Sequence, residues 1–313
     1  MIIASHPLSR YISNLSRYRK RYGVYTAFRT LIHYGIRFSK KNFTDYSKPQ
    51  IVKVNGYKLN VVPNDVGISS ELLVFKVHEP LTTKLISKLL KKGMICLDIG
   101  SNIGYYALLE HKIVGNEGKV IAIEPSPANY NTLKENIKLQ NSTNIENYNF
   151  AAGNKNGITK FVIDKRSNGC MTVPEGEEPI IPGEIIEVPI KKIDDFVDEI
   201  KLSQLDFLRM DVEGYEQYVF DGMSKTLEKF KPMIQIEVHA SIMGKETTIK
   251  LLETLKKQGY DIIYYIPRDV DVPIIGTSRN IKKYDIPTII DKLEKKLLPS
   301  FFMLILKNTL KHN

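Results

Sequence analysis

An apolar strand that runs directly into a glycine turn and then into a helix limits the fold of this chain more than any other feature. The predicted strand covers residues 94–99, the turn reads Gly100-Ser-Asn-Ile-Gly104, and a helical pattern follows over 105–113. Glycine permits a tight turn and lets a ligand approach the backbone. In open α/β sheets, ligands bind outside the carboxyl ends of the strands. This segment therefore predicts an α/β fold with a ligand at the turn.

Strand and helix patterns alternate along most of the remaining chain. Alternation of this kind is typical of a parallel sheet covered by helices on both faces. The last apolar run is expected to be a closing edge strand, and a proline-containing segment, 166–184, is expected to be a long loop that folds over an acceptor through Asn168 and Gly169. The predicted strands are 119–123, 146–152, 207–211, 233–239, 262–266 and 301–306, and the predicted helices are 81–90, 127–139, 217–229 and 247–258.

The first 50 residues form a basic arm, because they contain ten Lys or Arg residues and one acid, Asp45, and so supply +9 of the net charge of +10. Apolar residues recur there at three- and four-residue steps from Ile12 to Ile32, which predicts an amphipathic helix. We expect a helical cap on the main domain. Peripheral binding of residues 1–50 to anionic lipid, or binding to nucleic acid, is the alternative.

Two strand-like runs, 51–54 and 57–62, flank Asn55-Gly56, the strongest two-residue hairpin signal. The expected organisation is therefore a basic arm over 1–50, a β-hairpin and linker over 51–80, and the main domain over 81–313.

The composition gives the chain an ordinary globular character. Two cysteines, Cys96 and Cys170, are too few for a disulfide framework. No segment resembles a signal peptide, and no apolar run reaches the roughly 20 residues that span a bilayer. We therefore expect a cytoplasmic protein, with the basic arm available for peripheral membrane contact.

Two acids stand at successive strand ends. Asp98 heads the glycine turn and Glu124 ends the next predicted strand, 26 residues later. A carboxylate at Asp98 would repel a pyrophosphate, and the turn departs from the G-x-G-x-x-G spacing of dinucleotide folds. It could instead interact with the cationic methionine part of S-adenosylmethionine, while Glu124 could accept hydrogen bonds from both hydroxyls of a ribose. The two acids favour S-adenosylmethionine over a dinucleotide.

Three motifs together resemble the FkbM-type S-adenosylmethionine-dependent methyltransferases: Asp98-Ile-Gly-Ser-Asn-Ile-Gly104, Glu124-Pro-Ser-Pro127 and Asp211-Val-Glu-Gly-Tyr-Glu216. The resemblance covers about residues 70–306. It implies a Rossmann-like class I methyltransferase sheet of seven strands, mostly parallel with an antiparallel last strand, and O-methylation of a sugar or metabolite hydroxyl. It also implies the cofactor contacts, which are Asp98, Gly100, Ser101, Asn102 and Gly104 at the turn, Glu124, Pro125 and Ser126 at the ribose, and Phe150, Ala151 and Ala152 beside the adenine.

One residue departs from the family pattern. Arg209 stands where a lysine is more usual, two residues before Asp211, and it keeps the positive charge.

Acids also gather at the ends of the fourth and fifth predicted strands, which should meet the cofactor rim. We assign Asp211 to the cofactor or the nucleophile, His239 or Glu237 to the general base, and Glu213 or Glu216 to orientation of these groups. Asp211, Glu237 and His239 could instead hold a divalent metal ion, since hard cations take carboxylate ligands.

Three functions remain open at this stage. The first is O-methylation of a small-molecule or glycan acceptor, and the second is ribose methylation of RNA gripped by the basic arm. Base N-methylation is disfavoured, because Asp211-Val-Glu-Gly occupies the position where such enzymes often carry an Asn- or Asp-Pro-Pro-Tyr loop. The third is a non-catalytic cofactor-binding module or membrane-surface adaptor.

Overall fold

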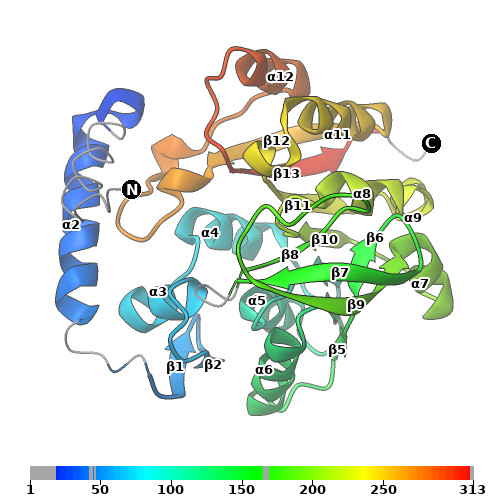
Figure 1. Cartoon of the computed structure of the whole chain (residues 1–313), viewed down its shortest axis with the longest axis horizontal. Helices are drawn as coiled ribbons and strands as arrows, with labels where there is room; N and C mark the ends of the chain where they lie inside the picture. The colour runs from blue at the N-terminus through cyan, green and yellow to red at the C-terminus, as the bar shows by residue number, and fades with distance from the viewer. Residues whose placement is uncertain (1–18, 42–44, 46, 165–168, 311–313) are drawn as a thin grey trace.

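The computed structural model of this chain describes residues 19–41, 45, 47–164 and 169–310. Its described strands form three sheets, and helix α2 (Val24–Lys41) stands along one side of the molecule (Figure 1). Ile12 and Leu15 of the predicted arm helix, and Asn168 of the predicted loop, lie outside the described residues. Every helix in the described ranges is too short or too polar to cross a lipid bilayer.

The main sheet has seven strands in the order β12-β13-β11-β10-β3-β4-β5. All neighbouring strands are parallel except β13, which runs antiparallel to both β11 and β12. The predicted Rossmann-like sheet, mostly parallel with an antiparallel last strand, is confirmed. The bounds are β3 (Ile95–Ile99), β4 (Lys119–Ile123), β5 (Ile145–Tyr148), β10 (Phe207–Met210), β11 (Met233–Val238), β12 (Tyr260–Pro267) and β13 (Phe302–Asn308).

The prediction that the last apolar run is an edge strand is wrong. Strand β13 lies between β11 and β12, and the residues from Phe302 to Leu306 are all buried. An uninterrupted apolar run suits a strand with neighbours on both sides and cover on both faces. The sheet ends at β12 and β5 instead.

Helices cover both faces of this sheet and make two separate cores. Along β3, Cys96 faces one core while Leu97 and Ile99 face the other, as the alternation of side chains along a strand requires. The first core includes α5 and α6, and the second includes α7, α8, α9, α11 and α12. The bounds are α4 (Pro80–Leu89), α5 (Tyr105–Val114), α6 (Pro127–Leu139), α7 (Ile193–Glu199), α8 (Glu216–Asp221), α9 (Ser224–Phe230), α10 (Ala240–Met243), α11 (Lys245–Lys257) and α12 (Ile286–Glu294).

A second sheet, of four strands in the order β6-β9-β7-β8, lies in front of the main sheet in Figure 1. It corrects two predictions. The expected strand 146–152 is divided between β5 of the main sheet and β6 of this one, and the expected loop 166–184 contains β8 and the first residue of β9. Pairing of β8 and β9 with β7 supplies the backbone hydrogen bonds that a loop lacks. The bounds are β6 (Ala151–Gly153), β7 (Gly157–Ile163), β8 (Cys170–Thr172) and β9 (Glu184–Lys192).

The predicted hairpin is present as β1 (Gln50–Val54) and β2 (Tyr57–Val61). Asn55 and Gly56 both have positive φ, at 49° and 85°, as a two-residue hairpin turn demands. Its buried residues, among them Val54 and Leu59, belong to the core beneath α5 and α6.

Helix α2 forms within the predicted arm helix and packs against the segment after β12, but through its polar side: Thr26, Thr30 and His33 are buried, and the predicted apolar residues Tyr25 and Phe28 are exposed. On the side of α2 that faces the body, Arg29 donates hydrogen bonds to the carbonyls of Ile275 and Gly276, and His33 contacts the carbonyl of Pro273. Arg37 likewise donates to Val66 before α3 (Ile68–Phe75). The arm arginines that bind these carbonyls therefore hold the helix to the body.

Candidate active site

Two cavities meet at the carboxyl ends of the central strands. The first, which we call the turn pocket, is lined by the glycine turn, the end of β4 and the second sheet. The second, which we call the charged cavity, is lined by acids and arginines at or just after the ends of β10, β11 and β12, by Glu79 before α4, and by tyrosines at the start of α5. Gly100, Asn102, Gly169, Asp211 and Glu213 line both.

Gly100 must be glycine for a tertiary reason. Its φ is +81°, and a Cβ there would lie 1.8 Å from the backbone oxygen of Asp211. Gly104 likewise has a φ of +93° at the N-cap of α5, where a Cβ would lie 2.6 Å from Leu133. The turn therefore presses its backbone against the end of β10 and leaves room above it for a ligand.

Glu124 lies at the wall of the turn pocket. Its carboxylate accepts the backbone N–H groups of Asn102 (2.7 Å) and Ser126 (2.9 Å), and burial raises its pKa to about 7. The carboxylate is held by the glycine turn before α5 and by the N-cap of α6. The placement suits the predicted ribose contact. Pro125 lines the same pocket, whereas Ser126 is buried as the N-cap of α6.

Asp98 occupies a different position from the one expected. Its side chain is fully buried and lines neither cavity; it forms an ion pair with Arg209 (3.0 Å). Because β3 and β10 are parallel neighbours, Arg209 sits directly opposite Asp98 in the register. The carboxylate thus supports the turn from behind and lines neither of the two cavities.

Arg209 connects the parts of this site. Beyond Asp98, it donates to the carbonyl of Gly100 (3.0 Å) and to Asp211 (3.0 Å), and its guanidinium lies over the ring of Tyr106. A lysine could not make all of these contacts at once, since only the guanidinium offers a planar fork of donors. The departure from the family pattern thus has a structural consequence.

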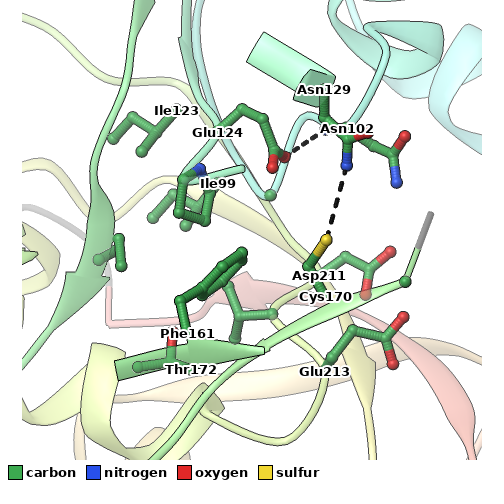
Figure 2. Close-up of a pocket in the computed structure, with 16 residues that line it drawn as sticks. Ile99, Asn102, Ile123, Glu124, Asn129, Phe161, Cys170, Thr172, Asp211 and Glu213 are labelled. Atoms are coloured by element: carbon green, nitrogen blue, oxygen red, sulfur yellow. Dashed lines mark hydrogen bonds between the residues drawn. The ribbon is translucent and has the colours of Figure 1, made fainter. Parts of the chain in front are cut away.

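The second sheet forms the opposite wall of the turn pocket. Phe161 of β7 and Cys170 and Thr172 of β8 line it, as Figure 2 shows, and these residues were missed from the sequence. The pattern of residues 157–163 carries a strand signal, rich in β-branched residues, that could have located Phe161. Of the expected adenine segment, Ala151 and Ala152 line the pocket. The side chain of Phe150 is instead buried in the core against Tyr148 and Phe196.

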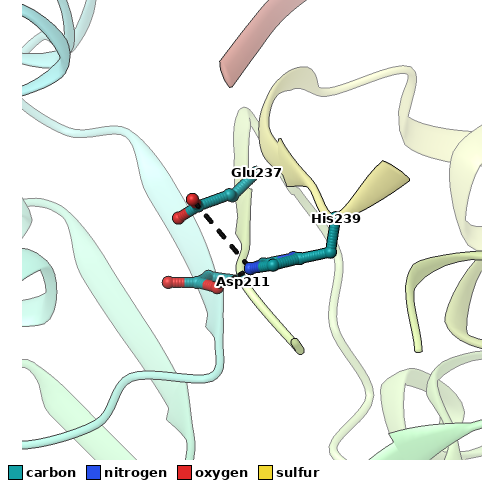
Figure 3. A group of neighbouring side chains, drawn as sticks. All are labelled: Asp211, Glu237 and His239. Atoms are coloured by element: carbon teal, nitrogen blue, oxygen red, sulfur yellow. Dashed lines mark ion pairs between the residues drawn. The ribbon is translucent and has the colours of Figure 1, made fainter. Parts of the chain in front are cut away.

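His239 stands at the centre of the charged cavity, surrounded by carboxylates. Its Nδ1 lies 2.5 Å from Glu216, and its Nε2 lies 3.1 Å from Glu213 and 3.9 Å from both Asp211 and Glu237. Figure 3 shows Asp211 and Glu237 converging on the same side of the imidazole. Of the five predicted catalytic residues, Glu216 alone lies outside the cavity wall, buried behind His239.

The carboxylates decide the charge of His239. Burial lowers its pKa, but Glu213 and Glu216 outweigh burial and hold the pKa well above the ordinary value. Burial and the charge of Asp211 raise the pKa of Glu237 to about 8. Burial also raises the pKa of Asp211, against the opposing effect of Arg209. A protonated imidazole orients neighbouring carboxylates better than it accepts a proton.

A second network closes the cavity and was largely missed from the sequence. Glu79, the residue before α4, is buried and pairs with Arg268 (3.1 Å) and His78 (3.0 Å), and it accepts a hydrogen bond from Tyr106. Arg268, in the 3-10 helix η1 (Arg268–Val270), also contacts Glu237 (3.2 Å). Residues about 190 positions apart are brought together here only by the fold.

Asp211 occupies the junction of the two cavities. One carboxylate oxygen, Oδ2, is bound by Arg209, while Oδ1 is buried and has no hydrogen-bond partner among the described residues. A hydroxyl placed in the junction could donate to Oδ1, because a buried carboxylate oxygen is stabilised by a donor.

Three groups predicted as metal ligands do converge. One ligand atom each from Asp211, Glu237 and His239 lies within 4.8 Å of the others. Carboxylate oxygens suit Mg²⁺ or Mn²⁺, and the Glu216 contact on Nδ1 of His239 resembles the support that metal-bound histidines receive. Arg268 already supplies a cation to Glu237, which competes with a metal for this carboxylate.

The chain matches the family described as Methyltransferase FkbM domain over residues 98–262. The hexuronic acid methyltransferase AglP of Haloferax volcanii is 27% identical over 236 residues, which are 74% of this chain and 90% of that protein. Methyltransferase 1 of Beauveria bassiana is 23% identical over 205 residues, which are 59% of this chain and 80% of that protein. A solved structure, Methyltransferase FkbM from Methylobacillus flagellatus, aligns with 54% of this chain and 39% of its own length at 20% identity and a TM-score of 0.39.

Proposed function

Because the chain belongs to the FkbM methyltransferase family, we propose that it transfers a methyl group from S-adenosylmethionine to a hydroxyl oxygen of a sugar. The observation that carries the proposal is the junction of the two cavities at Asp211, whose Oδ1 has no hydrogen-bond partner among the described residues. The turn pocket takes the donor and the charged cavity takes the acceptor.

The residues of the turn pocket fit the donor. Glu124 offers a carboxylate to two ribose hydroxyls, and Gly100, whose Cβ would clash with the backbone of Asp211, keeps the turn tight at the pocket wall. S-adenosylmethionine supplies an electrophilic methyl group when bound. Asn102 and Asp211, on the rim common to both cavities, are placed to orient the groups at the point of transfer.

The acceptor hydroxyl needs to lose a proton as it attacks. We assign proton removal to Asp211 and not to His239, since the carboxylates around His239 keep the imidazole protonated. Burial raises the pKa of Asp211, and a higher pKa makes its carboxylate a stronger base. His239 then neutralises the surrounding acids and holds Glu213 in place.

The polar lining of the charged cavity supports a sugar acceptor. Glu79, Glu213, Glu237 and Arg268 offer donors and acceptors around a space of about 1270 Å³ that includes its open mouth. The relative whose printed name specifies a substrate acts on a hexuronic acid, a sugar with a carboxylate. RNA is a weaker candidate, because the arm arginines Arg29 and Arg37 bind the backbone of the chain itself.

The test is to incubate the protein with methyl-labelled S-adenosylmethionine and a panel of hexose and hexuronic acid glycosides, with RNA as a separate acceptor. We expect label on a sugar that survives mild alkali, because a methyl ether is stable where a methyl ester hydrolyses. A glycoside that lacks the methylated hydroxyl is the matched control. Label found only in RNA, or only in alkali-labile form, would contradict a sugar hydroxyl acceptor.

A further inference from the structure

Helix α2 presents its apolar residues outwards and its polar residues inwards, the reverse of an ordinary surface helix. The side towards the body carries Thr26, Thr30 and His33, which are all buried. The opposite side, which we call the outer face, carries large apolar residues that are exposed to solvent. These are Val24 (72% exposed), Tyr25 (62%), Phe28 (58%), Leu31 (54%), Ile32 (40%) and Phe38 (69%).

The spacing of these residues makes the outer face continuous. They follow successive steps of one, three, three, one and six residues along a helix of 18 residues, about 27 Å long at 1.5 Å per residue. Six of the thirteen large hydrophobic residues that are exposed in the described structure belong to this one face. An apolar stripe of this size on a folded protein marks a surface that contacts something else.

A basic pocket adjoins the outer face at Tyr25. Four cations line it, namely Arg21, Arg279, Lys282 and Lys292, together with four tyrosines, namely Tyr22, Tyr25, Tyr265 and Tyr284; none of its lining residues is an acid. Asp269 lies beside it and pairs with Arg21 at 3.5 Å. The exposed residues Arg279 and Lys282 keep the pocket positive.

The positive charge of this surface indicates which kind of partner binds it. The exposed residues Arg19, Lys20 and Arg21 lie at the start of this surface, and residues 19–41 contain neither Asp nor Glu. Two copies of the chain pairing through their outer faces would bring like charges together, whereas anionic headgroups complement the charge. Tyrosines beside an apolar face are typical of residues that sit at the membrane–water boundary.

We propose that the outer face of α2 and the basic pocket dock the protein on an anionic phospholipid bilayer. The outer face lies in the headgroup region with its apolar side chains towards the acyl chains, and the basic pocket takes a lipid phosphate. Arg37, on the inner side of the same helix, lines the charged cavity, so the cavity adjoins the helix that docks.

Vesicle flotation tests the proposal without reference to methyl transfer. The wild-type protein is expected to float with vesicles of phosphatidylglycerol and phosphatidylcholine, to float little with pure phosphatidylcholine, and to detach as salt increases. The double variant Phe28→Ser with Leu31→Ser should weaken binding about 10- to 100-fold, and Arg279→Glu with Lys282→Glu should weaken it about tenfold or more.

Two matched control variants change exposed apolar or exposed charged residues at other places on the surface. Ile158→Ser with Ile185→Ser removes exposed apolar residues from β7 and β9, and Lys134→Glu with Lys138→Glu reverses exposed charges on α6. Both controls should bind vesicles like the wild type. All four variants change exposed side chains, and circular dichroism verifies that they fold.

Three results would overturn the proposal. The first is a wild-type protein that binds neither kind of vesicle. The second is an outer-face variant that floats like the wild type. The third is a dimer, seen by light scattering, that dissociates in the outer-face variant while vesicle binding is unchanged, because the face would then be covered by a second copy.

Discussion

The turn pocket and the charged cavity share a rim but are built in opposite ways. The turn pocket depends mainly on one glycine turn and one acid, with Glu124 held by two backbone N–H groups, of Asn102 in that turn and of Ser126 two residues along the chain. The charged cavity depends on side chains that neutralise one another across the fold, such as Glu79 with Arg268. The difference indicates that the donor site tolerates little change in a short motif, while the acceptor site depends on a balance of distant charges.

The largest effect on activity is expected at Asp211, on the rim that the two cavities share. Asp211→Asn removes the proposed base but keeps the shape of the side chain, so kcat should fall about 100- to 10,000-fold. The dissociation constant for S-adenosylmethionine, measured by calorimetry, should change little. Asp221→Asn, at the end of α8, is the matched control and should be active. If His239→Gln lowers kcat more than Asp211→Asn does, the imidazole is the base and our assignment is wrong.

A large effect on stability is expected at Arg209, which joins the two cavities. Arg209→Met leaves the buried Asp98 without its partner, so the free energy of unfolding should fall by about 3 kcal/mol. Urea denaturation followed by circular dichroism measures it. Arg209→Lys keeps the positive charge but not the fork of donors, and it should lower the free energy of unfolding by less than Arg209→Met does. Equal stability of Arg209→Met and the wild type would contradict a central role for this ion pair.

A smaller effect, confined to the donor side, is expected at Glu124. Glu124→Gln weakens the hydrogen bonds to the ribose, so the dissociation constant for S-adenosylmethionine should rise about 10- to 100-fold. The rate at saturating donor should stay near that of the wild type. Glu135→Gln on the exposed side of α6 serves as the control. A loss of kcat with unchanged donor affinity would move Glu124 out of the donor site.

The smallest effect is a pH dependence of donor binding. Burial raises the pKa of Glu124 to about 7, so its carboxyl group is protonated below that pH and ionised above it. Only the ionised form accepts hydrogen bonds from both hydroxyls through both oxygens. Donor affinity should therefore weaken by about tenfold at most as the pH falls from 8 to 6. Calorimetry at several pH values measures the trend, and Glu124→Gln should remove it; a pH-independent wild type would contradict the assignment.

Local patterns predicted the elements of the main sheet well, because each of these elements carries its own periodicity. The strand, turn and helix around Gly100 and the hairpin at Asn55 formed where expected. The four-stranded sheet was not anticipated, although residues 157–163 carry a strand signal. Its strands β8 and β6 are only three residues long, and pairing with β7 and β9 defines them.

The residues of the candidate site also differ in how well the sequence predicted them. Glu124 follows its strand directly, and its neighbours in sequence are also its neighbours in space, so sequence spacing located it. The side chain of Asp98 faces Arg209, and that of Phe150 faces the core, because the direction of a side chain depends on what packs beside it. Glu79 and Arg268 gave no joint signal, since their contact spans nearly the whole domain.

By itself, the sequence determined the Rossmann-like sheet, the glycine turn and the acid opposite it, because strand and helix periods and glycine conformation are local properties of the chain. Tertiary structure alone decided that Arg209 holds the turn to Asp211, that the second sheet walls the turn pocket, and that α2 turns its apolar face outwards. Each of these features depends on which distant parts of the chain come into contact, because that contact determines which charges and which apolar residues are buried.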